Sequence, residues 1–251
     1  MTRPRKRFGQ NFLHDRQVIE RIVAAIDPQP EDFVLEIGPG RGALTRRLFS
    51  ACKLTVVEID RDLAGELRAD EELAGLEIIE SDVLEIDLSA LGTKLRLVGN
   101  LPYNVSTPII FWALGQLETI RDMHFMLQKE VVDRMAAPPG GKDYGRLSVM
   151  VQYCCRVTPL FRVPPGAFFP APRVQSAVFR LTPLADRVAV ATDEVHFAKV
   201  VRYAFQQRRK TVANALKGLV APATLEAAGV DPRSRAEQLS VADFVAIANQ
   251  R

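Results

Sequence analysis

The sequence is poor in the residues on which several common kinds of site depend. Its 251 residues include only three cysteines, Cys52, Cys154 and Cys155, and only three histidines. Neither set has the spacing of a disulfide framework, a zinc site or a catalytic triad. Cys154 and Cys155 are adjacent in a strand-like run, so we expect them on opposite faces of a sheet and reduced. We assign no histidine a role and expect no metal.

Long apolar runs are also missing. No stretch approaches the roughly 20 residues that a membrane-spanning helix requires. The first ten residues contain four basic side chains but no apolar segment follows them, which is unlike a secretory signal. Hydrophobic residues make up 47% and charged residues 25%, which is typical of globular domains. The sequence therefore predicts a cytoplasmic protein with one large domain, or one domain and a small second one.

Positive charge is concentrated at the two ends of the chain. Residues 1–10 carry four basic and no acidic side chains, residues 185–251 carry ten basic and seven acidic ones, and the stretch between them is net negative. Basic ends on a mildly acidic body are expected where both ends hold a polyanion, although solvated surface charge explains the counts equally well. As candidate phosphate contacts we name six residues: Arg5, Lys6, Arg7, Arg208, Arg209 and Lys210.

Hydrophobic periodicity predicts alternating strands and helices in the first part of the chain. The predicted strands are 33–37, 54–60, 76–80, 94–99 and 123–127, and the predicted helices are 15–26, 43–51, 63–68, 106–114 and 128–134. This alternation is typical of an α/β fold with a mostly parallel sheet covered by helices on both faces. Ser106 is expected to cap its helix. Two later strands, 147–157 and 174–181, are expected to pair antiparallel at the sheet edge.

The composition changes near Ala185, after which the pattern is helical. Helices are predicted at 195–205, 211–219, 222–228 and 241–249, the last with a capping box made by Ser240 and Asp243. We therefore expect two domains, 1–184 and a small all-helical 185–251.

A glycine-rich loop, Gly38-Pro39-Gly40-Arg41-Gly42, follows the first predicted strand. Without Cβ atoms its backbone can approach a ligand closely, and the next helix presents N–H groups. Glu58 ends the next strand, where an acidic side chain can accept hydrogen bonds from ribose hydroxyls. Asp82 ends the third strand and can accept from an adenine amino group. The pattern predicts a nucleoside cofactor site, but Gly-x-Gly-x-Gly is not the nicotinamide fingerprint Gly-x-Gly-x-x-Gly.

The fourth predicted strand runs into Asn100-Leu101-Pro102-Tyr103. The side-chain carbonyl of Asn100 can accept a hydrogen bond from an amine, and Pro102 stiffens the turn so that neighbouring carbonyls can point into a cleft. Tyr103 offers a face on which a base can stack, typically worth ~1–3 kcal/mol. Such residues also end ordinary strands. At the same sheet edge as the glycine loop, they indicate a site for a planar ring that bears an amine.

Two proline-rich stretches have alternative interpretations. Residues 163–172 are too rich in proline for a helix or a central strand, and Phe168 and Phe169 within them either fill the core or supply a second stacking surface. The loop Pro138-Pro139-Gly140-Gly141 is either a mobile lid or a simple connection.

Several segments resemble the ribosomal RNA adenine dimethyltransferases, and the last of them resembles the branch that acts on small-subunit RNA. The similarity runs from about Arg7 to Leu219 and is carried by residues 9–13, 36–42, 58–60, 100–104, 128–131, 144–148, 164–168 and 205–211.

The resemblance implies a Rossmann-like class I methyltransferase sheet in residues 1–184, with a basic N-terminal arm, and a helical RNA-binding domain in 185–251. It implies S-adenosylmethionine as methyl donor, and dimethylation at N6 of two adjacent adenosines in a hairpin near the 3′ end of small-subunit rRNA. The expected partner is the immature small ribosomal subunit, and the expected state is a monomer. By similarity, the donor is bound by Asn11, Leu13, Gly38, Glu58, Asp82 and Asn100, and the catalytic residues are Asn100, Leu101, Pro102, Tyr103 and Phe168.

Two alternative functions are also considered. One is that of the resistance-type sister family, which acts on one adenosine of large-subunit rRNA. The basic block at 206–210 argues against this alternative. The other is a non-catalytic ribosome-assembly factor, which has no need of both the glycine loop and the Asn100–Tyr103 turn. A nicotinamide oxidoreductase is disfavoured by the glycine spacing.

Overall fold

The computed structural model describes residues 10–187, 189–207 and 209–250, and these form two compact units. Unit 1 contains residues 10–132 and 158–183, and unit 2 contains 133–157 and 184–250. The sequence predicts a single boundary near residue 185, whereas residues 133–157 also belong to the helical unit. The reason is α6 (Arg146–Cys154), which packs on α7 (Glu194–Gln206) and α10 (Val241–Asn249).

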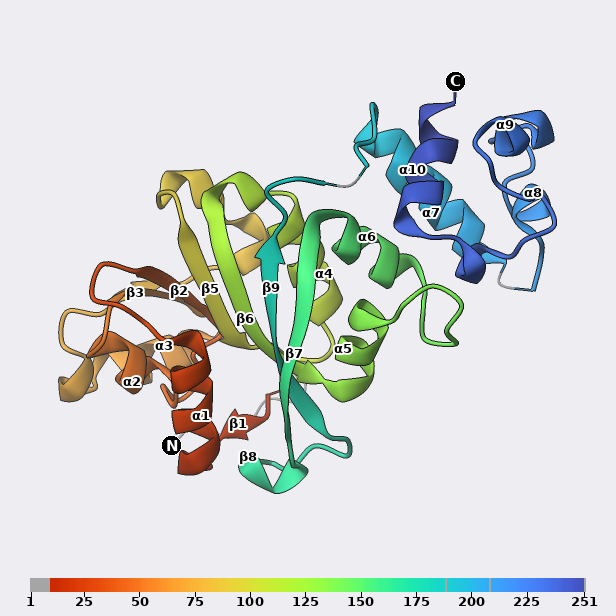
Figure 1. Cartoon of the computed structure of the whole chain (residues 1–251). Coiled ribbons are helices and arrows are strands. Elements are labelled where there is room, and N and C mark those ends of the chain that lie inside the picture. Colours follow the sequence, from red (N-terminus) through yellow and green to blue (C-terminus); the bar gives the residue numbers. More distant parts are fainter. Residues whose placement is uncertain (1–9, 188, 208, 251) are drawn as a thin grey trace. The chain divides into compact units, whose positions relative to one another are not determined.

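A seven-stranded mixed sheet organises unit 1, in the order β4-β3-β2-β5-β6-β9-β7 (Figure 1). Neighbours from β4 to β6 pair parallel, and β6 pairs antiparallel with β9. The strands are β2 (Phe33–Ile37), β3 (Lys53–Val57), β4 (Glu77–Ile79), β5 (Leu95–Asn100), β6 (Ile120–Gln128), β7 (Cys155–Val163) and β9 (Ser176–Pro183). The predicted mostly parallel sheet with an antiparallel edge is confirmed.

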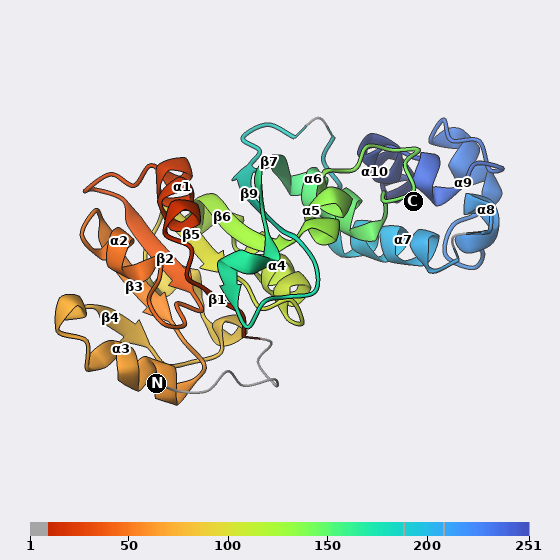
Figure 2. The same cartoon turned by 90° about the horizontal axis from the view of Figure 1, so that it is seen from below.

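The order of the strands explains where the helices lie. From β2 the chain moves to β3 and β4 in one direction, and from β5 to β6 in the other. Because crossovers between parallel strands are right-handed, the two directions place their helices on opposite faces. In Figure 2 the twisted sheet has α1 on one side and α4 on the other. The helices are α1 (Arg16–Ile26), α2 (Thr45–Phe49), α3 (Arg61–Arg68), α4 (Ser106–Leu114) and α5 (Lys129–Ala136).

One hydrophobic core of unit 1 forms between a face of the sheet and the helices α1 and α2. Val18, Ile19, Ile22 and Ile26 follow the helical period predicted for α1, and they pack on strand residues such as Val34. Asp15 caps the start of α1, because its Oδ1 accepts from the backbone N–H groups of Gln17 and Val18. A separate pair of short strands, β1 (Phe12–Leu13) and β8 (Phe168–Phe169), is antiparallel and lies below the main sheet in Figure 1.

Three local predictions were wrong. Residues 146–154 form α6 rather than a strand, because an apolar run of this length fits both periods, and Gly145 with Ser148 caps a helix there. Cys154 therefore ends a helix and does not face Cys155 across a sheet; both are buried and free, and burial raises their pKa values to about 11 and about 12. Ser106 is the first residue of α4, not its cap, and its hydroxyl donates to the Tyr103 carbonyl.

A buried ionic cluster lies near the amino ends of the central strands. The guanidinium of Arg96 in β5 donates to both carboxylate oxygens of Asp122 and to Oδ2 of Asp32. It also donates to the carbonyls of Ile26 and Asp27, which end α1. One side chain in β5 thus connects the end of α1 with β6 and with the residue before β2, at the end of the sheet opposite the cavity described below.

Unit 2 is helical. Besides α6, α7 and α10 it contains α8 (Val212–Ala215) and α9 (Pro222–Ala227), and the predicted capping box of Ser240 and Asp243 is present at α10. Among the described residues of both units, short 3₁₀ helices occur at Glu71–Leu73, Val83–Glu85, Leu88–Ala90, Leu117–Thr119, Pro165–Ala167 and Ala236–Gln238. Within the described residues, no helix has the length and apolarity to cross a membrane.

Candidate active site

A cavity of about 330 Å³ opens in unit 1 at the carboxyl ends of β2, β3 and β5. This is where open α/β sheets bind ligands, between strands whose connections leave in opposite directions. The glycine loop and the Asn100–Tyr103 turn both line it, as the sequence predicts. The candidate residues around the cavity are Asn11, Leu13, Gly38, Glu58, Asp82, Asn100, Leu101, Pro102 and Tyr103.

The glycine loop leaves β2 in a conformation that side chains disfavour. Gly38 and Gly40 have φ values of 65° and 58°. A Cβ on Gly38 would meet no atom within 4 Å, whereas one on Gly40 would lie 3.1 Å from the Phe12 ring. The expected helix at 43–51 shortens to α2 (Thr45–Phe49), after turns that include Gly42 at φ 75°. The backbone of the glycine loop, and not the start of α2, therefore forms this side of the cavity.

Glu58 joins the end of β3 to the glycine loop. Its Oε2 accepts from the Gly40 N–H at 3.1 Å and its Oε1 from the Asp60 N–H at 2.9 Å. Burial raises the pKa of Glu58, while these two backbone hydrogen bonds lower it. A carboxylate oxygen has more than one acceptor site, so a carboxylate held in this way can also accept from ligand hydroxyls.

Glu36 in β2 lies on the cavity floor and was not among the predicted site residues. It is 2% exposed, and its Oε2 has no hydrogen-bond partner among the described residues. Burial raises the pKa of Glu36, the nearby Thr45 hydroxyl lowers it and the charge of Glu58 raises it, to about 7 in all. The cavity therefore has a carboxyl group beneath it that a cationic ligand group would satisfy.

Replacing Glu36 with glutamine should change how stability depends on pH. In the folded wild type this carboxyl keeps its proton up to about pH 7, whereas its ordinary pKa is 4.5. Between these pH values the folded state binds more protons, so wild-type stability falls as pH rises. Glu36→Gln removes this loss. Between pH 4.5 and pH 8, the free energy of unfolding of the variant should therefore rise by about 3 kcal/mol relative to that of the wild type.

Urea unfolding of the ligand-free proteins at both pH values measures the difference. Glu31→Gln, at an exposed position before β2, is the control and should follow the wild type. If the stability difference between Glu36→Gln and the wild type is the same at both pH values, the carboxyl of Glu36 is not protonated in the folded protein at pH values above 4.5.

Asp82 follows β4 at the rim of the cavity. Its Oδ1 accepts from the Leu84 N–H at 3.0 Å and caps a 3₁₀ turn, which fixes the carboxylate beside the cavity. Leu84 and Ile59, which are 40% and 49% exposed, also line the cavity. Two apolar side chains and one carboxylate at a rim suit a flat ring with a polar edge.

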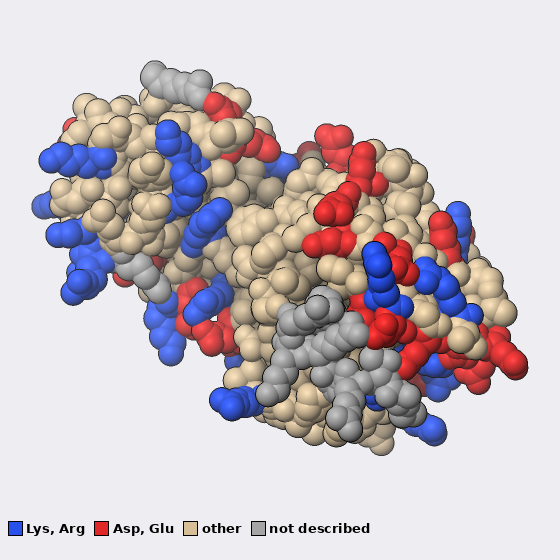
Figure 3. Space-filling view, turned by 180° about the vertical axis from the view of Figure 1, so that it is seen from behind, with Lys and Arg blue, Asp and Glu red and all other residues tan. Residues whose placement is uncertain are grey.

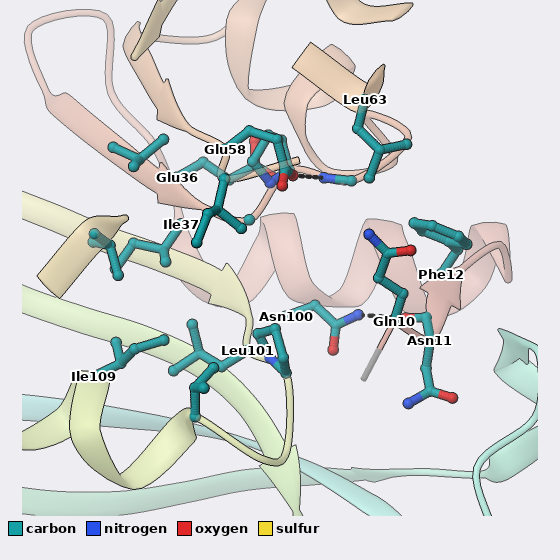
Figure 4. Close-up of a pocket in the computed structure, with 18 of the residues that line it drawn as sticks. Gln10, Asn11, Phe12, Glu36, Ile37, Glu58, Leu63, Asn100, Leu101 and Ile109 are labelled. Atoms are coloured by element: carbon teal, nitrogen blue, oxygen red, sulfur yellow. Dashed lines mark hydrogen bonds between the residues drawn. The ribbon is translucent and has the colours of Figure 1, made fainter. Parts of the chain in front are cut away.

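The segment Gln10–Leu13 forms another wall and is held at several points. Gln10 Nε2 donates to Asp60 Oδ2 at 3.1 Å, and the guanidinium of Arg41 lies 4.6 Å from the centroid of the Phe12 ring. Leu13 is buried in the core and pairs with Phe168. Figure 4 shows Gln10 and Phe12 across the cavity from Glu58, with Asn11 next to Asn100.

Asn100 has an orientation that the structure fixes. Its Nδ2 donates to the backbone carbonyl of Asn11 at 2.9 Å. Because a carbonyl can only accept, this contact identifies the amide nitrogen and turns Oδ1 the other way. In Figure 4 that oxygen points into the open space between Leu101 and Asn11. The predicted acceptor is therefore aimed into the cavity.

The turn after Asn100 is built from its own hydrogen bonds. The Leu101 N–H donates to the Met126 carbonyl, and the Pro102 carbonyl accepts from the Val105 N–H. In the described part of the chain, none of these contacts uses the Leu101 carbonyl, which remains able to accept. The Tyr103 hydroxyl lies 2.6 Å from that of buried Ser176. Burial raises the pKa of Tyr103 above its ordinary value, against the lowering effect of the Ser176 hydroxyl.

Phe168 fills the core, which is one of the two roles that the sequence allows for it. It is 2% exposed, packs in the hydrophobic core with Leu13 and Val163, and does not line the cavity. Residues of a strand alternate between faces, so the next residue, Phe169, points outward and is 60% exposed. In this structure Phe168 supports the strand pair of β1 and β8, which contains Leu13 and directly follows Asn11. The stacking of Phe168 on the base stays a prediction.

Of the candidate RNA contacts, Arg209 and Lys210 are exposed in unit 2. Arg5, Lys6, Arg7 and Arg208 lie outside the described residues. Exposed Lys199, Arg202 and Lys217 belong to the same unit. In the view of Figure 3, lysine and arginine side chains (blue) gather over this unit. Among the described residues, no group of three or more His, Cys, Asp or Glu side chains could hold a metal ion.

Structural comparison defines the class of the protein. The fold is shared with a dimethyladenosine transferase from Plasmodium falciparum, at 25% identity and a TM-score of 0.77, covering 94% of this chain and 95% of that one. It is also shared with a 23S rRNA methyltransferase, at 28% identity and a TM-score of 0.73, covering 96% and 99%. The fold is that of a Rossmann-like class I methyltransferase, as predicted.

Sequence comparison gives the family. The model of the ribosomal RNA adenine dimethylase family matches residues 1–251. Relatives named ribosomal RNA small subunit methyltransferase A include those of Xylella fastidiosa, 54% identical over 100% of this chain and 97% of the relative, and of Xanthomonas campestris pv. campestris, 56% identical over 98% and 95%. This chain belongs to the ribosomal RNA adenine dimethylase family, and the resemblance seen in the sequence is confirmed.

Proposed function

We propose that this enzyme transfers methyl groups from S-adenosylmethionine to N6 of two adjacent adenosines, twice each, in a hairpin near the 3′ end of small-subunit rRNA, during biogenesis of the subunit. The observation that carries the proposal is Asn100, whose Oδ1 is turned into the cavity that the glycine loop also lines. Relatives at 54–56% identity with a small-subunit name favour this substrate over the large-subunit alternative, whose solved example is 28% identical.

The residues around the cavity suit the methyl donor. Glu58 would accept from the ribose hydroxyls and Asp82 from the adenine amine, with Ile59 and Leu84 against the ring. Gly38 would allow close approach of the amino-acid part, whose ammonium would satisfy the buried Oε2 of Glu36. Asn11 and Leu13 would close the cavity over it. When bound, the donor supplies an activated methyl group on sulfur, so positioning matters more than a strong base.

The target adenine would be held by the Asn100–Tyr103 turn. Its exocyclic amine is a poor nucleophile because the lone pair is delocalised into the ring. Two acceptors, Asn100 Oδ1 and the Leu101 carbonyl, would draw the amine toward tetrahedral geometry and stabilise the positive charge that develops on nitrogen. Pro102 keeps the turn rigid. An adenosine in a helix must leave its stack to reach this turn, and the Tyr103 ring would hold it.

Exposed basic side chains of unit 2, together with the N-terminal arm, would grip the RNA backbone. Affinity for small subunits should then fall steeply as salt rises, because each neutralised phosphate releases counterions. Arg209→Gln with Lys210→Gln should lower the slope of log affinity against log salt by about 1–2. Lys53→Gln, at the start of β3 and far from the cavity edge, should leave the slope unchanged. If the wild type, the double variant and Lys53→Gln have the same slope, Arg209 and Lys210 do not contact the RNA backbone.

The direct test is incubation of the protein with methyl-labelled S-adenosylmethionine and small subunits that lack adenine dimethylation, followed by mapping of the label. The proposal expects two adjacent N6,N6-dimethyladenosines near the 3′ end of the RNA. Label in large-subunit rRNA would favour the sister activity. No transfer, with donor binding intact, would favour a non-catalytic assembly factor.

A further inference from the structure

The exposed large apolar side chains of unit 1 are not scattered. Among the described residues they are Ile59, Leu84, Phe169 and Val174. The first two line the cavity. The other two lie on the loop 169–175, at 60% and 45% exposure. Single exposed apolar residues are ordinary, but a phenylalanine at this exposure beside a binding cavity indicates a surface that something covers.

Both ends of this loop are attached to the lining of the cavity. At its start, Phe169 in β8 is the cross-strand partner of Phe12 in β1, and Phe12 lines the cavity. Immediately after its end, the hydroxyl of Ser176 lies 2.6 Å from that of Tyr103, which also lines the cavity. The loop therefore runs along the rim, from the wall that carries Asn11 to the side chain proposed to hold the target base.

The direction of the Phe169 side chain follows from the strand pair. Phe168 points into the core, so its neighbour points to the other face. Directly opposed residues of an antiparallel pair lie on the same face, with Cβ atoms roughly 5 Å apart. Phe169 thus extends, outside the cavity, the aromatic surface that begins at Phe12 (Figure 1 shows β1 beside β8).

We propose that Phe169 is a stacking platform for the nucleotide next to the adenosine that enters the cavity. The proposal rests on the function proposed above, since it assumes an RNA strand at this rim. When one nucleotide leaves the stack, its neighbour loses a stacking partner, and an exposed aromatic ring at the rim replaces it. Phe169 would then hold the strand in place while Tyr103 holds the target.

The chemistry of the loop favours RNA over another occupant. The loop 169–175 contains no acidic side chain, two prolines that restrict its backbone, and exposed Arg173, which suits a phosphate. A stable protein interface buries roughly 800 Å² on each partner, which two apolar side chains on one loop do not provide. By contrast, one aromatic ring and one cation on the protein are enough to bind one nucleotide of single-stranded RNA.

Photo-crosslinking tests the contact directly. Phe169 is replaced by p-benzoylphenylalanine in the full chain, which is bound to undermethylated small subunits with S-adenosylhomocysteine present and irradiated. The expected crosslink is to a nucleotide directly adjacent to the adenosines that the wild-type enzyme methylates. Crosslinks to a ribosomal protein, or to nucleotides elsewhere in the RNA, would overturn the proposal.

Steady-state kinetics provides the second test. Phe169→Ala should raise KM for small subunits about 5- to 100-fold, and Phe169→Trp should restore it, because any aromatic ring stacks. Val190→Ala, at an exposed apolar position in unit 2, is the control. Binding of S-adenosylhomocysteine should be equal in all variants, because Phe169 does not line the cavity. A KM in Phe169→Ala equal to wild type would reject the platform.

The two proposals fail in different ways. If the wild type transfers no methyl group to small-subunit RNA, the proposed function is wrong. If the wild type transfers normally and Phe169→Ala does so with unchanged KM, only the platform is wrong.

Discussion

Asn100→Ala is expected to lower the rate of methyl transfer to small subunits about 10²- to 10³-fold, with donor affinity reduced only a few-fold. The rate falls because the side-chain acceptor for the amine is lost, and removing one such preorganised contact typically costs roughly 2.7–4 kcal/mol in the transition state. Donor affinity depends mainly on other residues, among them Glu58 and Asp82, which the change leaves in place. Single-turnover transfer and titration with S-adenosylhomocysteine measure the two quantities.

Asn100→Asp separates the acceptor from its orientation. Aspartate keeps an oxygen that can accept from the amine, but it cannot donate to the Asn11 carbonyl, which now holds the side chain at 2.9 Å. The expected rate lies between those of Asn100→Ala and the wild type. Asn249→Ala, an exposed amide at the end of α10, should transfer at the wild-type rate. A wild-type rate in Asn100→Ala would reject the assignment of the acceptor.

Arg96→Met is expected to destabilise the protein by roughly 3–5 kcal/mol. The side chain is 5% exposed and forms ion pairs of 2.7 Å with Asp32 and 3.0 Å with Asp122. Without it, the Asp122 carboxylate stays in the sheet without its arginine, and the carbonyls of Ile26 and Asp27 lose a donor. Melting temperature and urea midpoint at neutral pH measure the loss.

Arg121→Met is the matched control. Arg121 also pairs with Asp32, at 2.6 Å, but its side chain is 53% exposed. Exposed ion pairs contribute about 0–1 kcal/mol, so this variant should remain close to the wild type. Equal losses in the two arginine variants would show that burial of the pair does not determine its contribution.

The sequence predicted the elements that repeat a pattern. The strands from β2 to β6 and the apolar face of α1 have periods that can be read directly, and parallel strands bring their carboxyl ends to one edge. The glycine loop, Glu58, Asp82 and Asn100 were therefore placed together before any coordinates. The prediction of a strand at residues 146–154 was wrong because an apolar run of this length suits a helix and a strand equally.

The remainder of the site depends on contacts between distant segments. Glu36 lies in a predicted strand, and only its buried position beneath the cavity makes it a candidate for the site. The hydrogen bond from Asn100 to Asn11 joins residues 89 positions apart. The motif that contains Phe168 and Phe169 indicated an aromatic contact, but which ring is exposed depends on strand pairing between β1 and β8. Sequence spacing alone does not contain that information.

A crystal structure of the protein with S-adenosylhomocysteine and an RNA that contains the target adenosine tests the central claim most directly. The account predicts the adenine N6 within hydrogen-bond distance, about 2.7–3.2 Å, of both Asn100 Oδ1 and the Leu101 carbonyl. It also predicts that the sulfur lies in the same cavity, on the side of Gly38. An adenine bound elsewhere on the protein, or an Asn100 oxygen turned away from N6, would contradict it.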